Sequence, residues 1–282
     1  MQIAHLEITL AGDEKGNIPS YQMGSLFHGW LMERVSPDYA RLLHQSEMKP
    51  FSQYVEKKGQ EAIWHISALD RTACQEIIVP LLEEDFSCIE IRHKKEVFKA
   101  GEKKLVYSFA SYKELADRYY LESTPSRVVK MEMVTPVSFR SGGEYQIFPS
   151  LHLIYQNLIN RWNQFADKVS LEEKNLAATL AEHSFISGYR LETRYFPLEK
   201  IFIPAFAGRM SIKIAAPSPM VALINMLLGY SAFSGLGIKT SLGMGGVRVI
   251  EEKRGEWSGK RQAILKIHSS RKFLMIKYSY GD

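Results

Sequence analysis

Two histidines and a lysine lie close together in the N-terminal part of the chain: His28, His44 and Lys49. An imidazole titrates near neutral pH, so a pair of histidines can remove one proton and supply another within one reaction. A lysine ammonium stabilises negative charge that develops on phosphate oxygens. Together these side chains could cleave a phosphodiester by general acid–base catalysis.

Each of these residues also has an ordinary structural interpretation. A histidine at the end of a helix, as predicted for His44, commonly interacts with the last carbonyl groups. His28 borders an apolar helical stripe and could be a half-buried core residue. Lys49 is by default a solvated lysine, and Tyr39 fits the core. From the residues alone, the structural interpretation is favoured.

The other histidines and the two cysteines show no metal-ligand spacing such as H-E-x-x-H or paired Cys/His. We therefore expect no metal site and no cofactor. With two cysteines a disulfide scaffold is excluded, and a reducing compartment is favoured. The residues concerned are His5, His65, His93, His152, His183, His268, Cys74 and Cys88.

A second candidate site is the segment 229–246, which has six glycines in eighteen residues. Backbone N–H groups in such a loop can cradle a phosphate, and Lys239, Thr240 and Ser241 would add a cation and two hydroxyls. However, Thr240 occupies the position of the last glycine in a dinucleotide fingerprint, and Ile238 that of the glycine before a P-loop lysine. Tight packing of helix against strand explains the glycines equally well, and both interpretations stay open.

The first half of the chain predicts the order strand, broken helix, two strands, helix, strand. Alternation of apolar and polar residues indicates the first strand, and helical spacing of apolar residues after Ser20 indicates the first helix. Ser36-Pro37 is a typical start for the second helical piece. The predicted ranges are 2–10, 20–31, 36–46, 51–55, 62–68, 70–82, 86–91 and 96–100.

The second half predicts the same order with one extra helix, at 128–137, 151–165, 171–182, 187–203, 205–214, 219–228 and 247–250. Each half thus has the βαββαβ pattern of a ferredoxin-like domain. We predict an α+β fold of two tandem ferredoxin-like domains, 1–120 with the candidate active site and 121–282 with the glycine-rich loop. A C-terminal β extension is predicted from 263–268 and 273–278.

Composition indicates a soluble globular chain. It has 282 residues, 45% of them hydrophobic, and a net charge of +5 with a pI of about 9.0. The charge permits an anionic partner without requiring one. The N-terminus does not resemble a signal peptide, and no segment is apolar enough to span a bilayer, so we expect a cytoplasmic protein with no membrane contact.

Four stretches carry a family resemblance. Residues 233–245, Phe-Ser-Gly-Leu-Gly-Ile-Lys-Thr-Ser-Leu-Gly-Met-Gly, resemble the glycine-rich motif of the repeat-associated RNA-binding (RAMP) superfamily of CRISPR systems. Residues 135–143, Thr-Pro-Val-Ser-Phe-Arg-Ser-Gly-Gly, and Phe148-Pro149 with Arg161-Trp-Asn163 are similar to elements of its repeat-processing endoribonucleases. Leu43-His44 followed by Lys49-Pro50-Phe51 resembles the active-site stretch of those nucleases.

The resemblance implies a metal-independent endoribonuclease that cuts precursor CRISPR RNA within repeats. Attack by the 2′-hydroxyl would leave a 2′,3′-cyclic phosphate and a 5′-hydroxyl. His28 and His44 would share the base and acid roles, in an order that the sequence leaves open, and Lys49 would stabilise the phosphorane.

The resemblance also implies that RNA passes the glycine-rich loop. Partners would be precursor and mature CRISPR RNA; effector-complex subunits and a homodimer stay open. Alternatives are a catalytically inactive RNA-binding subunit of an effector complex, or an enzyme that binds nucleotide phosphates through the loop. The run of basic residues at 92–104 fits a solvated hairpin or a phosphate track. The predicted RNA contacts are Arg140, Ser234, Gly235, Gly237, Lys239, Thr240 and Ser241.

Overall fold

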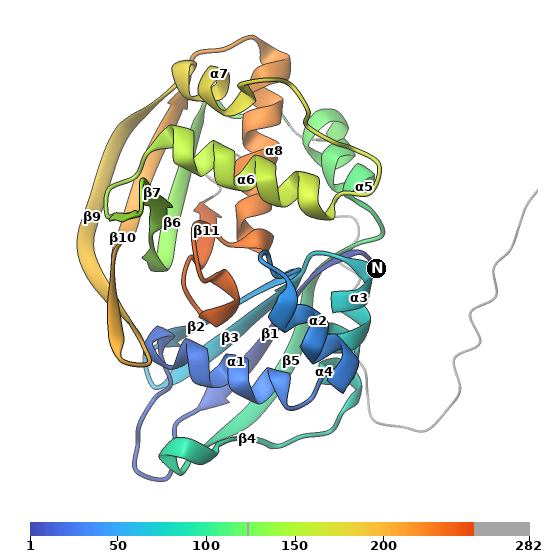
Figure 1. Cartoon of the computed structure of the whole chain (residues 1–282), viewed down its shortest axis with the longest axis vertical. Coiled ribbons are helices and arrows are strands. Elements are labelled where there is room, and N and C mark those ends of the chain that lie inside the picture. Colours follow the sequence, from blue (N-terminus) through green and yellow to red (C-terminus); the bar gives the residue numbers. More distant parts are fainter. Residues whose placement is uncertain (123, 251–282) are drawn as a thin grey trace, which may run out of the picture. The chain divides into compact units, whose positions relative to one another are not determined.

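The computed structural model describes residues 1–122 and 124–250, which form two antiparallel sheets with their helices (Figure 1). The five-stranded sheet comes from the first half of the chain and has the order β2-β3-β1-β5-β4. Its elements are β1 (Ile3–Ala11), η1 (Tyr21–Met23), α1 (Gly24–Met32), α2 (Pro37–Gln45), β2 (Phe51–Lys58), β3 (Glu61–Ala68), α3 (Arg71–Ala73), the π-helical turn η2 (Cys74–Ile78), α4 (Val79–Glu83), β4 (Cys88–Ile91), η3 (Arg92–Lys94) and β5 (Glu96–Phe109).

The four-stranded sheet comes from the second half and has the order β11-β6-β10-β9, while β7 and β8 form a separate hairpin. The elements are α5 (Tyr112–Asp117), η4 (Arg118–Glu122), β6 (Val128–Val137), β7 (Phe139–Ser141), β8 (Glu144–Gln146), α6 (Leu151–Phe165), α7 (Leu176–Glu182), β9 (Ser184–Leu198), β10 (Ile201–Ile214), α8 (Ser218–Ser234), η5 (Thr240–Leu242) and β11 (Val247–Ile250).

Both sheets have the strand order of a ferredoxin-like domain, which confirms the predicted fold class. In each, the first strand lies between the third and the last, and all these pairs are antiparallel. The predicted C-terminal β extension lies outside the described residues. The predicted domain boundary near residue 120 stays a prediction.

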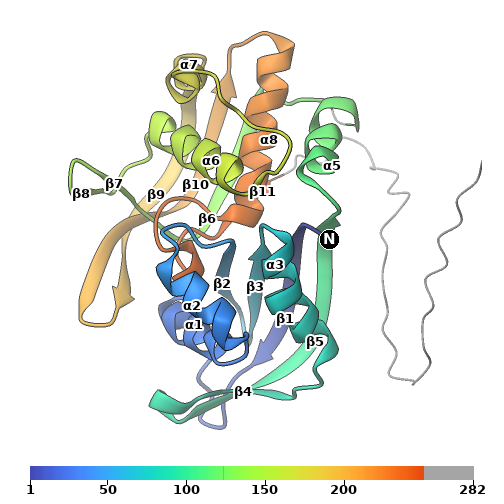
Figure 2. The ribbon, with the colours of Figure 1, turned by 45° about the vertical axis from the view of Figure 1, so that its right-hand side comes forward.

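The two faces of strand β1 are used differently. Leu6, Ile8 and Leu10 are fully buried in a core that they share with α1, α2 and the helices before β4. His5 and Glu7 lie on the opposite face, because side chains alternate along a strand. Figure 2 shows α1 and α2 on one side of this sheet. The sheet therefore separates two environments, one on the α1 side and one on the α8 side.

The helix α2 begins as its sequence predicts. The side chain of Ser36 accepts a hydrogen bond from the backbone N–H of Tyr39 at 3.3 Å, and Pro37 occupies the first turn. Lys49 caps the C-terminal end of α2, because its ammonium donates to the backbone oxygens of Leu43 and Ser46. These carbonyls would otherwise lack a partner, since the last turn of a helix has no intrahelical donors for them.

Several boundaries differ from the predicted ones; for example, the helix predicted at 171–182 begins only at Leu176, and α8 continues to Ser234 instead of ending at 228. The strand predicted at 96–100 continues as β5 to Phe109, because its backbone pairs with β1 through residues 101–104, which are glycine and charged residues and show no apolar alternation. The strands β9 and β10 turn at Glu199–Lys200 instead of before Ala205. Pro204 fits inside β10 because at that point β10 pairs only with β9, so the missing N–H breaks no second ladder.

Within the described residues, no helix is long and apolar enough to cross a membrane.

Candidate active site

The glycine-rich loop between α8 and β11 is packed tightly against its own half of the chain. A Cβ added to Gly237 would lie 2.3 Å from the backbone oxygen of Ser138, and one added to Gly245 would lie 2.2 Å from that of Leu236. Both glycines have positive φ, at 82° and 71°. The loop N–H groups are used internally: that of Gly237 donates to Asn157 Oδ1 at 2.9 Å. Close packing of backbone therefore explains why glycine is needed at these two positions.

The same loop contacts helix α1 in the first half of the chain. A Cβ added to Gly24 would lie only 2.3 Å from the backbone oxygen of Leu242 and 2.8 Å from Cα of Gly243. The side chain of Gln53 reinforces this contact, because its Nε2 donates to the backbone oxygens of Gly24 at 2.8 Å and Ser241 at 3.0 Å. The loop thus lies directly beside the helix that carries His28.

His28 lies on α1 with its imidazole stacked on the ring of Phe51, at 5.8 Å between centroids and 4° between planes. Burial lowers the pKa of His28 to about 4; the backbone of Ser241 opposes this shift and the charge of Lys49 adds to it. His28 is therefore neutral at physiological pH. The two groups that act on this pKa, Ser241 and Lys49, are both candidate residues named from the sequence.

Lys49 is half-buried between α2 and β2. Burial lowers the pKa of its ammonium, and the positive charge of Lys239 lowers it further. Lys239 itself is exposed, in a left-handed conformation with φ of 56°. The two ammonium groups, one from each half of the chain, therefore repel one another. A bound anion would reduce this repulsion.

His44 is exposed in the last turn of α2. It directly follows Leu43, whose backbone oxygen accepts from Lys49. Lys49 therefore relates to both histidines. Its charge acts on His28, and its ammonium binds the backbone oxygen of the residue before His44.

The predicted RNA contacts fall into two groups. Arg140 on β7 and Lys239 are exposed. The others are buried: the hydroxyl of Thr240 accepts from Nη2 of the buried Arg161 at 2.9 Å, and that of Ser234 donates to the backbone oxygen of Gly235 at 2.8 Å. The buried residues that RNA was predicted to contact are Ser234, Gly235, Gly237, Thr240 and Ser241.

Exposed aromatic side chains on β9 and β10 were not predicted. Tyr189 is 62% exposed, Tyr195 59% and Phe202 70%. Tyr189 and Tyr195 are six residues apart on one strand, so they lie on the same face. Phe148 contacts Tyr189 edge-to-face, with 5.8 Å between centroids. The available signal was the even spacing of Tyr189 and Tyr195 within the predicted strand 187–203.

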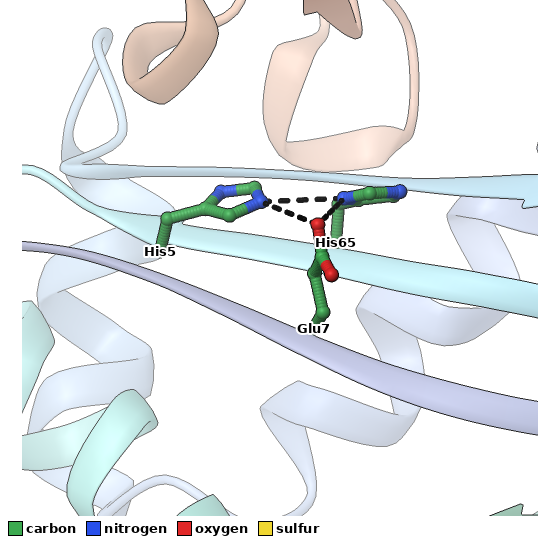
Figure 3. Close-up of side chains that lie close together, drawn as sticks. All are labelled: His5, Glu7 and His65. Carbon is green, nitrogen blue, oxygen red and sulfur yellow. Dashed lines mark hydrogen bonds and ion pairs between the residues drawn. The ribbon is translucent and has the colours of Figure 1, made fainter. Parts of the chain in front are cut away.

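A buried polar cluster also escaped the sequence analysis. His5, Glu7 and His65 lie together on the α8 side of the five-stranded sheet (Figure 3). His5 and Glu7 are two residues apart on β1, and His65 pairs directly with Glu7 across from β3. Motif spacing along the chain could not reveal them, because the pairing of β1 with β3 joins residues about sixty positions apart.

Comparisons with known proteins agree on one family. A family model described as CRISPR-associated endoribonuclease Cas6 matches residues 131–247. A Streptococcus thermophilus protein named CRISPR-associated endoribonuclease Cas6 is 33% identical over 241 residues, which cover 83% of this chain and 94% of that protein. A Mycobacterium tuberculosis protein of the same name is 28% identical over 251 residues, covering 88% and 78% of the two chains.

Solved structures share the fold. A Thermus thermophilus Cas6 has a TM-score of 0.66 and 23% identity, with 88% of this chain and 98% of that chain covered. A Cas6 product complex has a TM-score of 0.72 and 20% identity, with 89% and 100% covered. With a relative above 30% identity over most of its length and this fold, the chain belongs to the Cas6 family of CRISPR-associated endoribonucleases.

Proposed function

We propose that this protein cuts precursor CRISPR RNA within its repeats by metal-independent acid–base catalysis. The 2′-hydroxyl would attack the adjacent phosphate, and the products would carry a 2′,3′-cyclic phosphate and a 5′-hydroxyl. The observation that carries the proposal is the docking of the glycine-rich loop on the first half of the chain, which places the backbone of Ser241 at His28 and the charge of Lys239 near Lys49. Curated relatives named as endoribonucleases support the same activity.

The environments of the two histidines suggest their roles. Burial keeps His28 neutral at pH 7, and a neutral imidazole can accept the proton of the 2′-hydroxyl. His44 would then protonate the 5′-oxygen as it leaves. Two of the three N–H groups of the Lys49 ammonium donate to backbone oxygens, and the third can donate to the phosphorane. This fixed ammonium would stabilise the transition state more than a freely rotating one.

RNA would contact the exposed cations of the site and the exposed aromatics. Arg140 and Lys239 are the predicted contacts that are exposed to solvent. Tyr189, Tyr195 and Phe202 offer faces on which unpaired bases can stack. The buried loop residues would act by holding Lys239 in position. Binding of effector-complex subunits, or of a second copy, belongs to the same proposal and is measurable by the mass of the RNA complex in solution.

The test is cleavage of a labelled repeat RNA in excess EDTA, at a temperature where the EDTA-treated protein is folded by circular dichroism. Wild type, His44→Ala and His152→Ala are compared; His152 is an exposed histidine on α6 and serves as the matched control. A second substrate carries a deoxyribose just 5′ of the scissile phosphate. We expect cleavage at one position by wild type and His152→Ala only, and none of the deoxy substrate.

Other results would change the conclusion. If wild type binds repeats from several families but cuts none of them, the protein is an RNA-binding subunit without catalysis. If it cuts only after a divalent ion is restored, the acid–base mechanism without metal is wrong. If His44→Ala cuts as fast as the control, His44 is a helix-end residue with no part in the chemistry.

A further inference from the structure

The cluster of His5, Glu7 and His65 lies on the sheet face opposite to α1. The register of β1 and β3 pairs Glu7 with His65 and His5 with Ser67, so these side chains emerge on one side of the sheet. On β2 the same side carries Ser52, whose hydroxyl donates to the backbone oxygen of Phe233 at the end of α8. The cluster is therefore separated by the sheet from His28, which stacks on the other face against Phe51.

Three potential ligand atoms converge in this cluster, as Figure 3 shows. Nε2 of His5 lies 3.2 Å from Nδ1 of His65. Oε1 of Glu7 lies 3.5 Å from Nδ1 of His65 and 3.8 Å from Nε2 of His5. Ligands about 2.0–2.1 Å from a tetrahedral zinc ion are separated from one another by about 3.3 Å. The three observed separations scatter around this value, so an ion can enter with only small adjustments of the side chains.

In both histidines, the ring nitrogen that points away from the cluster already has a hydrogen-bond partner. Nδ1 of His5 is 2.7 Å from the hydroxyl of Ser67, and Nε2 of His65 is 3.2 Å from Oε2 of Glu56. Hydrogen bonds of this kind orient metal-binding histidines and fix the tautomer that leaves the inner nitrogen unprotonated. Glu56 is in turn bound by Arg248 at 2.7 Å and by Lys58 at 3.2 Å. The support that a metal site needs is thus present in this chain.

Charge and burial also suit a cation. The side chain of His65 is 4% exposed and that of His5 9%, whereas that of Glu7 is 29% exposed, which gives an ion a path from solvent. The positive charge that faces Glu7 is Lys104 on β5, its partner in the strand register. An ion would share the Glu7 carboxylate with this lysine.

We propose that His5, Glu7 and His65 form a binding site for a divalent transition-metal ion, best matched by Zn²⁺, with a water as the fourth ligand. Two imidazoles and one carboxylate select such ions over Mg²⁺ or Ca²⁺, which require oxygen ligands. The site lies under the end of α8 and the glycine-rich loop. The ring of Phe233 contacts His5 edge-on at 6.3 Å, and Tyr54, whose ring Gly246 covers, stacks on His65 at 4.3 Å. A bound ion would therefore stabilise the packing of the two halves.

The test measures zinc binding to tag-free protein without RNA, so its result is independent of whether the protein cuts RNA. Isothermal titration and the visible spectrum of the Co²⁺ derivative are recorded for wild type, Glu7→Gln, His65→Gln and the control His152→Gln. Glu7→Gln is isosteric and its side chain is partly exposed, so this variant should fold even if His65→Gln does not. Circular dichroism and the melting temperature in EDTA verify folding of each variant.

We expect wild type and His152→Gln to bind one Zn²⁺ per chain, to show a four-coordinate Co²⁺ spectrum and to melt several degrees higher with zinc than in EDTA. Glu7→Gln and His65→Gln should lose more than about tenfold in affinity, and with it the rise in melting temperature. Mg²⁺ should have no effect. Absence of zinc binding by wild type in excess metal overturns the proposal, as does equal affinity of wild type and folded Glu7→Gln.

Discussion

Adding a single methyl group at Gly24 tests whether the glycine-rich loop and α1 must be in contact. The Cβ of Gly24→Ala would lie 2.3 Å from the backbone oxygen of Leu242 and 2.8 Å from Cα of Gly243. Both obstacles are backbone, so neither can rotate away, and the loop and the helix must separate. Gly29→Ala in the same helix is the matched control, because a Cβ there has no atom within 4 Å.

The expected effects have opposite signs. Replacing an exposed helical glycine by alanine stabilises a helix, so Gly29→Ala should gain about 0.5–1 kcal/mol. At Gly24 the same gain is outweighed by overpacking, which costs about 1–3 kcal/mol, for a net loss of about 1–2 kcal/mol. The two variants should therefore differ by about 1.5–3 kcal/mol, which corresponds to about 3–12 °C in melting temperature for a chain of this size.

Thermal unfolding and single-turnover cleavage of repeat RNA measure the two consequences. Gly24→Ala should melt lower than wild type and cut more slowly even where it is fully folded, because Ser241 would be displaced from His28 and Lys239 from Lys49. Gly29→Ala should melt slightly higher and cut normally. If the two variants have the same melting temperature, or if Gly24→Ala melts lower yet cuts at the wild-type rate, the contact does not position the site as argued.

Three further predictions concern named groups. The pKa of His28 is about 4 in the folded chain and about 6.5 when unfolded, so the unfolded chain alone binds a proton between these values and stability falls as pH decreases from 6.5 to 4. Wild type should lose up to about 3 kcal/mol more than His28→Gln over that range in urea unfolding, and equal losses would contradict the buried environment. Arg161→Met removes the donor to Thr240 and Gly237. We expect this variant to lose about 1–3 kcal/mol in the free energy of unfolding and to cut more slowly. Unchanged stability and cleavage rate would show that Arg161 does not hold the loop. Burial raises the pKa of Glu56, but hydrogen bonds from His65 and Arg248 outweigh it and lower that pKa to about 2, so its contribution is present above pH 4.5 and lost as pH falls toward 2. Glu56→Gln should therefore cost on the order of 1 kcal/mol at pH 7 after solvent screening, with a smaller cost at high salt and none near pH 2, and a cost that is independent of pH would refute the ion pair with Arg248.

Local patterns were sufficient to predict the order of the main strands and helices, but not the short helix α5 or the β7–β8 hairpin. The apolar spacing of α6 and the cap at Ser36 are properties of short segments, and so is the alternation of β1, which is why these elements were found where the sequence places them. Element ends were less predictable, because β5 extends to Phe109 only by pairing with β1, a partner far away in sequence.

The candidate residues were predictable by type, and their assembly was not. His28, His44 and Lys49 stand out by chemistry and by the family resemblance of the surrounding stretch. The docking of the glycine-rich loop on α1 brings Lys239 near Lys49 and buries His28, which keeps it neutral. This docking joins residues about two hundred positions apart, so no local pattern contains it.

The two βαββαβ units and the residue types available for chemistry can be read from local patterns, because periodicity, caps and motifs are encoded within a few neighbouring residues. Long-range packing sets which glycines are required by close backbone contact and which lysines come near one another. It also placed His5, Glu7 and His65 within reach of one ion, since strand register and the packing of one half on the other are set by contacts that no local pattern contains.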